Sequence, residues 1–198
     1  MKNTLPGLLM AGLLLALTPL VSGAEKAVGL EGGGFVPSDT TFREFFKEGI
    51  TEGVSFHLRT RQGFGLLFLA DYYTQTRTFQ RENFRVTSYP VSLQMMYYLD
   101  ESPRLSPFLA VGVSGLWAGE ENVTTGRHIG LSAKVGLGGS AGVEFGPRYW
   151  RVRPYFRWSC VTIPGQVAVQ GLNLSGYTIV VGANLNFGQP KKPAQPSP

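Results

Sequence analysis

Apolar and polar side chains alternate without a break along residues 129–145. One set of alternate positions, from Ile129 to Phe145, is apolar apart from a glycine, and the other set is small, hydroxylic or charged. Because successive side chains of a β-strand point to opposite faces, the pattern predicts a strand with one apolar face and one polar, crowded face. Strands of globular proteins usually have about 5–6 residues, whereas a barrel strand that crosses a bilayer needs roughly 9–11 residues of this pattern. The length therefore indicates a strand of a membrane-spanning barrel.

The same alternation recurs in further segments, and these complete the predicted fold. The other predicted strands are residues 26–36, 53–60, 64–75, 84–99, 107–117, 150–161 and 174–187. Long connections (37–52, 76–83, 119–127 and 162–173) alternate with short ones (61–63, 100–106 and 146–149). Membrane barrels alternate long external loops with short periplasmic turns in the same way. We therefore predict an all-β, eight-stranded antiparallel up-and-down transmembrane β-barrel with both ends in the periplasm.

A soluble β-sandwich also alternates apolar and polar faces, so alternation alone leaves two architectures open. The polar face here is rich in glycine, alanine and serine, which suits the crowded interior of a small barrel better than an exposed sheet face. Aromatic residues lie mainly near the strand ends of the apolar face, where the membrane–water interfaces attract amphipathic rings. They are Tyr72, Tyr89, Tyr97, Trp117, Phe145, Trp150, Trp158, Tyr177 and Phe187. Both features favour the barrel.

Two local features interrupt the regular pattern. Pro90 lies inside a predicted strand, where a proline normally marks an edge or a bulge. Residues 41–44 have the form of a capping box and Gly49 suits a helix C-terminus, which predicts a short helix in the first long connection. One side of that helix either touches lipid headgroups or a partner, or packs on the barrel mouth. That side carries Phe42, Phe45 and Phe46.

The first residues have the features of a secretory signal peptide. Lys2 is a positive start, Leu8–Leu17 is an apolar core and Ser22–Ala24 is a small-residue cleavage site. The apolar run is shorter than the roughly 20 residues of a spanning helix. Export of this kind predicts the outer membrane of a Gram-negative cell as the location. The predicted parts are a signal peptide (1–24), the barrel (25–187) and a disordered, Pro- and Lys-rich periplasmic tail (188–198).

Composition narrows the classes of function. The chain has 26 glycines and 16% charged residues, which is typical neither of a disordered chain nor of a helical membrane protein. Cys160 is the only cysteine, so an intramolecular disulfide framework is excluded. The net charge of +5 is spread along the chain without a basic block, so we predict no nucleic-acid partner.

Three segments resemble the outer-membrane β-barrel domain family, a group of small OmpA/OmpX/OmpW-like barrels. Ser88–Val91 followed by Pro107–Val113 is similar to the strands of this family, and Pro37–Asp39 with Phe42 is similar to the first loop of some members. Alternate apolar residues along 177–187 resemble the C-terminal insertion signal of outer-membrane proteins, although here the chain continues to residue 198. The resemblance implies contact with outer-membrane lipid and lipopolysaccharide, and recognition of the 177–187 strand by the barrel-assembly machinery.

Charged residues at inward positions predict a network inside the barrel. The acidic residues are Glu31, Asp71 and Glu144, and the basic residues are Arg59, Lys134, Arg151, Arg153 and Arg157. Unpaired charge in a narrow interior is costly, and Arg–carboxylate pairs are the usual remedy. If Phe145 and Trp150 flank the short turn between them, Glu144 lies opposite Arg151. We therefore predict a lumen plugged by ion pairs, whose surplus positive charge is solvated by water, Tyr155, Asn184 and Asn186.

No group of residues specifies a catalytic, cofactor or metal site. Some barrels of the resembled kind modify lipid A with a His, a Ser and an acid, and His57 near Ser55 and Asp71 is the nearest match. The reaction needs base–nucleophile contact near about 3 Å, which sequence spacing cannot supply. His128 lies at a loop edge with no acid placed beside it. We therefore predict no enzymatic activity, no cofactor and no metal.

Three functions are compatible with such a barrel. The leading hypothesis is a structural or surface-interaction role, in which the external loops carry any binding. The alternative is a narrow porin-like channel for small polar or hydrophobic solutes. A lipid A-modifying enzyme is the third. The sequence does not identify a ligand, because the loops contain no recognisable motif.

Overall fold

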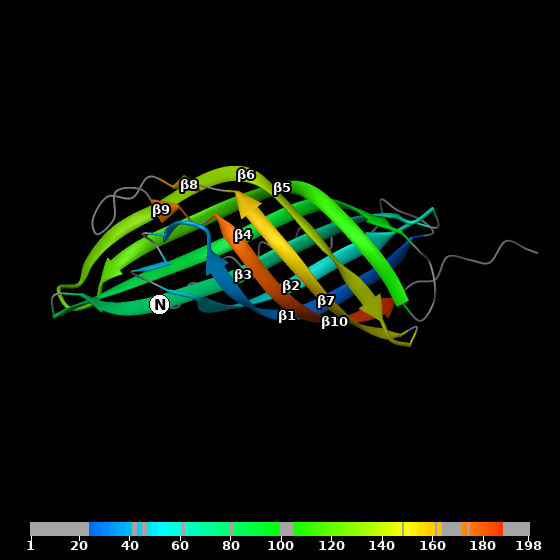
Figure 1. Ribbon diagram of the computed structural model, residues 1–198, viewed down its shortest axis with the longest axis horizontal. Helices are drawn as coiled ribbons and strands as arrows, with labels where there is room; N and C mark the ends of the chain where they lie inside the picture. The colour runs from blue at the N-terminus through cyan, green and yellow to red at the C-terminus, as the bar shows by residue number, and fades with distance from the viewer. Residues whose placement is uncertain are drawn as a thin grey trace, which may run out of the picture.

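Eight strands of the chain close into one antiparallel barrel (Figure 1). The computed structural model describes residues 24–40, 43–44, 47–60, 62–79, 81–99, 105–147, 149–160, 162–163, 172–173 and 175–187. The barrel strands are β1 (Glu25–Pro37), β2 (Gly49–Arg59), β3 (Phe64–Phe79), β4 (Glu82–Tyr98), β5 (Leu105–Asn122), β6 (Arg127–Phe145), β7 (Trp150–Cys160) and β10 (Gly176–Phe187). Each strand pairs with its neighbours in the chain, and β1 pairs with β10 to close the ring. The predicted fold class is confirmed.

The remaining described segments are short. β8 (Thr162–Ile163) and β9 (Leu172–Asn173) form a separate antiparallel pair. The predicted signal peptide up to residue 23 and the tail 188–198 lie outside the described residues. Within the described ranges, no helix has the length and apolar character needed to cross a membrane.

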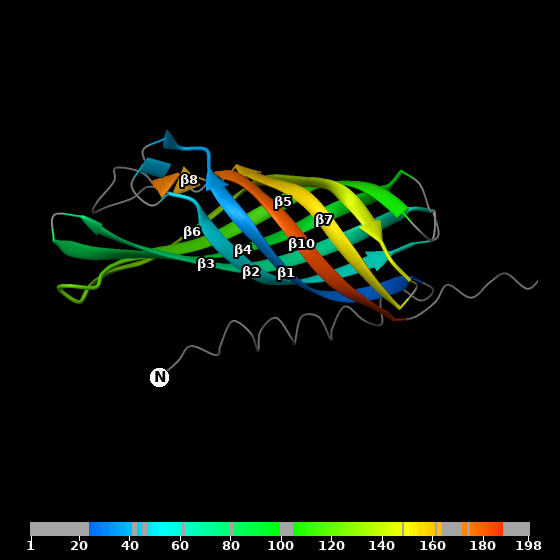
Figure 2. The ribbon, with the colours of Figure 1, turned by 60° about the horizontal axis from the view of Figure 1, so that its bottom comes forward.

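The two ends of the barrel differ in shape (Figure 2). Lys26 pairs with Phe187, so β1 begins and β10 ends together, at what we call the terminal end. The hairpins β3–β4 and β5–β6 project at the opposite end, which we call the hairpin end. The short turns around Gly63 and Gly146 lie at the terminal end, where both glycines have positive φ values (79° and 132°) that other residues rarely adopt. The connections predicted to be short therefore lie together at the terminal end.

Two segments at the hairpin end that were predicted to be loops are largely strand in the structure. Residues 76–83 and 119–127 were expected to be loops, but strand pairing continues to Phe79–Glu82 and to Asn122–Arg127. The apolar alternation ends earlier because polar cross-strand contacts replace it. Asn122 Nδ2 donates to Glu82 Oε2 at 2.6 Å, and Arg85 Nη1 lies 3.5 Å from Glu121 Oε2.

The alternation itself is confirmed along the strands. Leu93 is 48% exposed on the outer face, whereas the adjacent Ser92 is 5% exposed and points inward. The outer face carries an exposed apolar surface, which is what a lipid-facing barrel requires. Aromatic pairs from neighbouring strands lie on it, with ring centroids 5.0 Å apart for Phe64–Tyr97, 5.5 Å for Tyr72–Tyr89 and 5.6 Å for Phe156–Tyr177.

Pro90 interrupts one ladder. The β3–β4 pairing runs through Ala70–Val91 and resumes at Tyr73–Ser88, so the position of Pro90 is skipped. Proline has no backbone N–H to donate across a ladder. On its other side Pro90 stays paired with Leu116 of β5. The irregularity predicted from this proline is therefore present on the β3 side alone.

The connection between β1 and β2 contains helical hydrogen bonds. The Arg43 N–H donates to the Asp39 carbonyl at 3.0 Å, and the Lys47 N–H donates to the Arg43 carbonyl at 2.9 Å. Lys47 has a φ of 60°, so it takes the left-handed conformation that was expected of Gly49. Gly49 instead begins β2, where a Cβ would collide with the ring of Tyr73. The three phenylalanines of this predicted helix lie outside the described residues.

Candidate functional site

Arg153 is at the centre of a buried network in the lumen. Its side chain is fully buried, and Nη2 donates to Glu31 Oε1 at 2.6 Å and to Ser55 Oγ at 2.9 Å. Arg153 Nη1 lies 3.0 Å from His57 Nδ1. The Tyr155 hydroxyl donates to the other oxygen of Glu31 at 2.5 Å. Both carboxylate oxygens of Glu31 are therefore bonded, as a buried carboxylate requires.

Glu144 organises a second group nearer the terminal end. Its Oε2 accepts from the Tyr98 hydroxyl at 3.1 Å and from Arg151 Nη1 at 3.4 Å, and its Oε1 accepts from Asn184 Nδ2 at 3.0 Å. The guanidinium of Arg59 lies 3.9 Å from the centroid of the Tyr98 ring, which is within cation–π distance.

The turn between β6 and β7 has a different register from the predicted one. Phe145 pairs with Val152 and not with Trp150. The shift is two residues, which keeps every side chain on the same face because the period of a strand is two. The predicted contact of Glu144 with Arg151 is therefore present despite the wrong register.

Arg157 and Asp71 form a third ion pair, with Nη1 and Oδ2 2.6 Å apart. Seven of the eight charged residues predicted for the lumen are buried: Glu31, Arg59, Asp71, Glu144, Arg151, Arg153 and Arg157. Lys134 is exposed, and its predicted place in the network is wrong. The described β6–β7 pairing ends at Leu137–Cys160, so Lys134 lies on the part of β6 that projects past β7.

The residues considered for catalysis make other contacts. Ser55 and His57 both contact Arg153, whereas Asp71 contacts Arg157. His128 lies at the hairpin end with Nε2 3.6 Å from Glu121 Oε1. Among the described residues, no group of three or more His, Cys, Asp or Glu side chains is placed to hold a metal ion.

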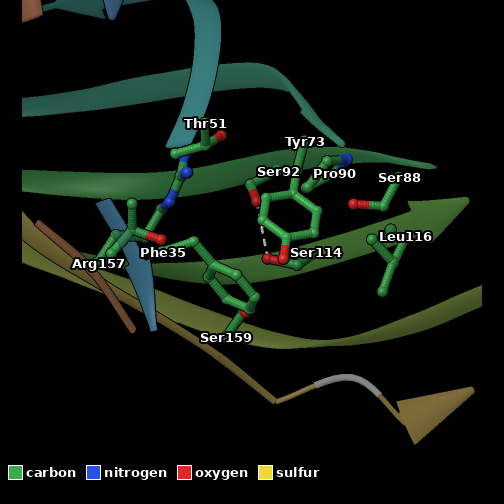
Figure 3. A pocket seen from close by; sticks show the side chains of 12 residues that line it. Phe35, Thr51, Tyr73, Ser88, Pro90, Ser92, Ser114, Leu116, Arg157 and Ser159 are labelled. Carbon is green, nitrogen blue, oxygen red and sulfur yellow. Dashed lines mark hydrogen bonds between the residues drawn. The ribbon is translucent and has the colours of Figure 1, made fainter. Parts of the chain in front are cut away.

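A cavity lies on the hairpin side of the Arg157–Asp71 pair (Figure 3). Its empty volume of about 540 Å³ includes space open to solvent. Serine and threonine side chains from several strands line it, and the hydroxyls of Ser92 and Ser114 are 2.7 Å apart. The lining residues are Phe35, Thr51, Tyr73, Ser88, Pro90, Ser92, Ser114, Gly115, Leu116, Arg157, Ser159 and Thr178.

Comparison with solved structures decides what kind of barrel this is. Neither a protein-family model nor a curated protein sequence matches the chain. The outer-membrane protein OprG from Pseudomonas aeruginosa matches with a TM-score of 0.67 and 11% identity, over 83% of this chain and 96% of that one. Neisserial surface protein A (NspA) matches with a TM-score of 0.55 and 18% identity, over 84% of this chain and 98% of that one. The attachment invasion locus protein Ail of Yersinia pestis matches with a TM-score of 0.52 and 14% identity, over 84% of this chain and 100% of that one. This chain has the fold of a small outer-membrane β-barrel. The resemblance noted in the sequence is confirmed at the level of the fold.

The lumen of the barrel also contains an apolar cluster that the sequence pattern did not predict. Its members are Leu67, Leu69, Met96, Tyr98, Phe108, Ala110, Tyr155 and Val180. Leu67 and Leu69 occupy inward positions of β3, where they break the polar pattern of the inner face. These two leucines were the feature of the sequence from which the apolar cluster could have been predicted. The cluster marks the part of the lumen in which large side chains exclude water.

Inward glycines make room for the large side chains of the barrel interior. Gly142 lies opposite Tyr155, Gly53 opposite Asp71 and Gly29 opposite Asn184, each on the neighbouring strand. A Cβ at any of these glycines would collide with the side chain across from it. The small residues on the polar face are therefore explained by the crowding of an eight-stranded interior.

Proposed function

We propose that this chain is an outer-membrane barrel with a closed lumen and no catalytic activity of its own, which acts through surfaces presented at its hairpin end. In this proposal the signal peptide directs export, the strand Tyr177–Phe187 is recognised by the barrel-assembly machinery, and the apolar outer face contacts membrane lipid and lipopolysaccharide. The outer-membrane origin of OprG and the surface role in the name of NspA support the location. The buried ion-pair network is the observation on which the proposal rests.

The network supports a closed lumen because it reaches across the barrel. Its bonded side chains come from β1, β2, β4, β6, β7 and β10, and the Asp71–Arg157 pair adds β3. The apolar cluster occupies neighbouring inward positions. Ion pairs with direct contacts of 2.6 Å hold their partners without an intervening water. An open aqueous pore would instead keep its charges separated along the wall.

The wild-type protein should be silent in planar lipid bilayers. Cutting Glu144 or Arg153 back to alanine should produce conductance, because each change removes a large side chain from the network. Single-channel recording of the purified wild type and the two variants measures this. Stable, reproducible conductance steps in the wild type would show that the closed-lumen proposal is wrong.

The two long hairpins support a surface role because hydrogen bonds join their described tips. The Val123 N–H donates to the Asn83 carbonyl at 2.7 Å, and the Asn83 N–H donates to Thr124 Oγ1 at 2.8 Å. These bonds join the tips of the two long hairpins into one sheet. A pre-formed sheet loses little conformational entropy when a partner binds to it. The partner itself is not identified by these contacts.

The hairpin end should face the cell exterior. A cysteine at Thr125, in a Cys160→Ser background, should react with a membrane-impermeant maleimide on intact cells, and one at Gln62 should not. Thr125 and Gln62 are exposed at opposite ends of the barrel, so the pair reports orientation directly. Labelling of permeabilised cells is the control that both cysteines can react. Reaction at Gln62 but not at Thr125 would reverse the orientation.

A narrow channel for small solutes is the alternative function. The cavity beside Arg157 favours it, since this space includes volume open to solvent. For conduction the space would have to continue past the Arg153 and Glu144 groups to the terminal end. The bilayer recording described above separates the two functions.

A further inference from the structure

The cavity beside Arg157 contains buried hydroxyl groups with no hydrogen-bond partner among the described residues. Thr51 is 4% exposed and Tyr73 is 2% exposed, yet neither Thr51 Oγ1 nor the Tyr73 hydroxyl bonds another group in the described part of the protein. A buried hydroxyl left unpaired typically costs about 1–3 kcal/mol, so folded proteins rarely keep two of them together. Figure 3 shows the Tyr73 ring in the middle of the cavity and the Arg157 side chain extending toward Thr51. All three residues line the same cavity.

The charge offered to the cavity is positive. Among the described residues that line the cavity, Arg157 is the sole Arg, Lys, Asp or Glu. Its ion-pair partner Asp71 is not among these lining residues, so the guanidinium is the charged group that reaches the cavity. Arginine can only donate hydrogen bonds, and the hydroxyls of Thr51 and Tyr73 can donate as well. An anionic group that accepts through two oxygens, such as a carboxylate, complements these three donors.

The rest of the lining limits what the carboxylate can carry. Phe35, Pro90 and Leu116 provide apolar walls, and the rings of Phe35 and Tyr73 meet edge to face with centroids 5.3 Å apart. The space in the cavity that water-sized molecules can reach holds about three water molecules. That space suits a chain of only a few carbon atoms.

We propose that this cavity binds a short-chain carboxylate. The carboxylate oxygens accept from Arg157, Thr51 and Tyr73, and the short alkyl group packs against Phe35, Pro90 and Leu116. The site is independent of the closed-lumen proposal, because it lies on the hairpin side of the network and does not require passage through it.

The test is a titration of the purified, isotope-labelled protein in lipid nanodiscs with sodium propionate, followed by NMR. Sodium chloride is the reference at equal ionic strength. Propionate should cause saturable shifts at residues that line the cavity. Thr51→Val and Tyr73→Phe should each weaken binding about tenfold, the usual effect of losing one hydrogen bond to a charged group. Tyr72→Phe changes the neighbouring, outward-facing tyrosine and should leave binding unchanged.

Stability of the ligand-free variants separates binding from structure. Because Thr51 Oγ1 and the Tyr73 hydroxyl make no protein hydrogen bond, removing them should leave resistance to urea unchanged or increase it. Weaker propionate binding in a variant at least as stable as the wild type supports the site.

Three results would overturn the assignment. The first is a propionate titration with no saturable shifts. The second is equal binding of propionamide, a neutral molecule of the same shape, because the guanidinium would then not recognise charge. The third is wild-type affinity in both hydroxyl variants. None of these results depends on whether the barrel conducts.

Discussion

Replacing Arg153 with methionine should lower the free energy of unfolding by about 3–5 kcal/mol, the usual effect of removing one partner from a buried ion pair. The change strands Glu31, which keeps the Tyr155 hydroxyl as a donor but loses the guanidinium 2.6 Å away. Methionine retains much of the length of the side chain, so the loss is mainly electrostatic. Urea-dependent folding into lipid vesicles, read from the gel shift between folded and unfolded barrels, measures the difference.

Arg85→Met is the matched control for Arg153→Met. Arg85 is likewise paired with a carboxylate, that of Glu121 at 3.5 Å, but this pair is on the exposed outer surface of the hairpin end. Its loss should cost about 0–1 kcal/mol, as for other surface pairs. Combining Arg153→Met with Glu31→Gln should cost less than the sum of the single changes, because neither partner is left as an unpaired charge. Equal effects of Arg153→Met and Arg85→Met would show that the lumen is solvated.

Arginine at Leu93 should destabilise the folded barrel by about 2–4 kcal/mol if this position lies near the bilayer midplane. Leu93 is exposed on the apolar outer face of β4. Val181 is exposed on β10, across the barrel from β4, and Val181→Arg should have the same effect. Thr76→Arg is the control, since Thr76 is exposed on β3 beyond the predicted membrane region. The same vesicle-folding assay measures all three variants. A cost at Thr76 as large as that at Leu93 would mean that the membrane boundary has been misplaced.

The face on which each barrel side chain lies could be predicted from the sequence, because a two-residue period is a local property. Leu93 and Ser92 show this on one strand, and the burial of Arg153 shows it for the lumen. How far each strand extends was harder to predict. The outer parts of β3–β6 are held by polar contacts such as Asn122 with Glu82, and these do not appear as hydrophobic alternation.

The other features that the sequence did not predict correctly depend on how separate strands are placed against one another. The register of β6 against β7 differs by two residues from the prediction, which no pattern of faces can detect. Lys134 occupies an inward position of the two-residue alternation, but it lies where β6 has no described pairing with β7. The cavity brings together Thr51, Tyr73 and Arg157 from three strands. Hydroxyl groups are common on the inner face, so nothing in the sequence distinguishes the hydroxyls of Thr51 and Tyr73 from those that have a hydrogen-bond partner.

The glycines that face large residues across neighbouring strands constrain how this barrel can change in evolution. Gly142 with Tyr155, Gly53 with Asp71 and Gly29 with Asn184 each share one fixed volume of the interior. At Gly29 the atoms that a Cβ would meet first belong to the side chains of Asn184 and Ser55, so a larger residue there is compatible with the fold if those side chains become smaller. At Gly142 a Cβ would also meet the backbone of Pro154 and Tyr155, which no replacement removes. The interior should therefore diverge by compensating replacements around position 29, whereas position 142 should remain glycine.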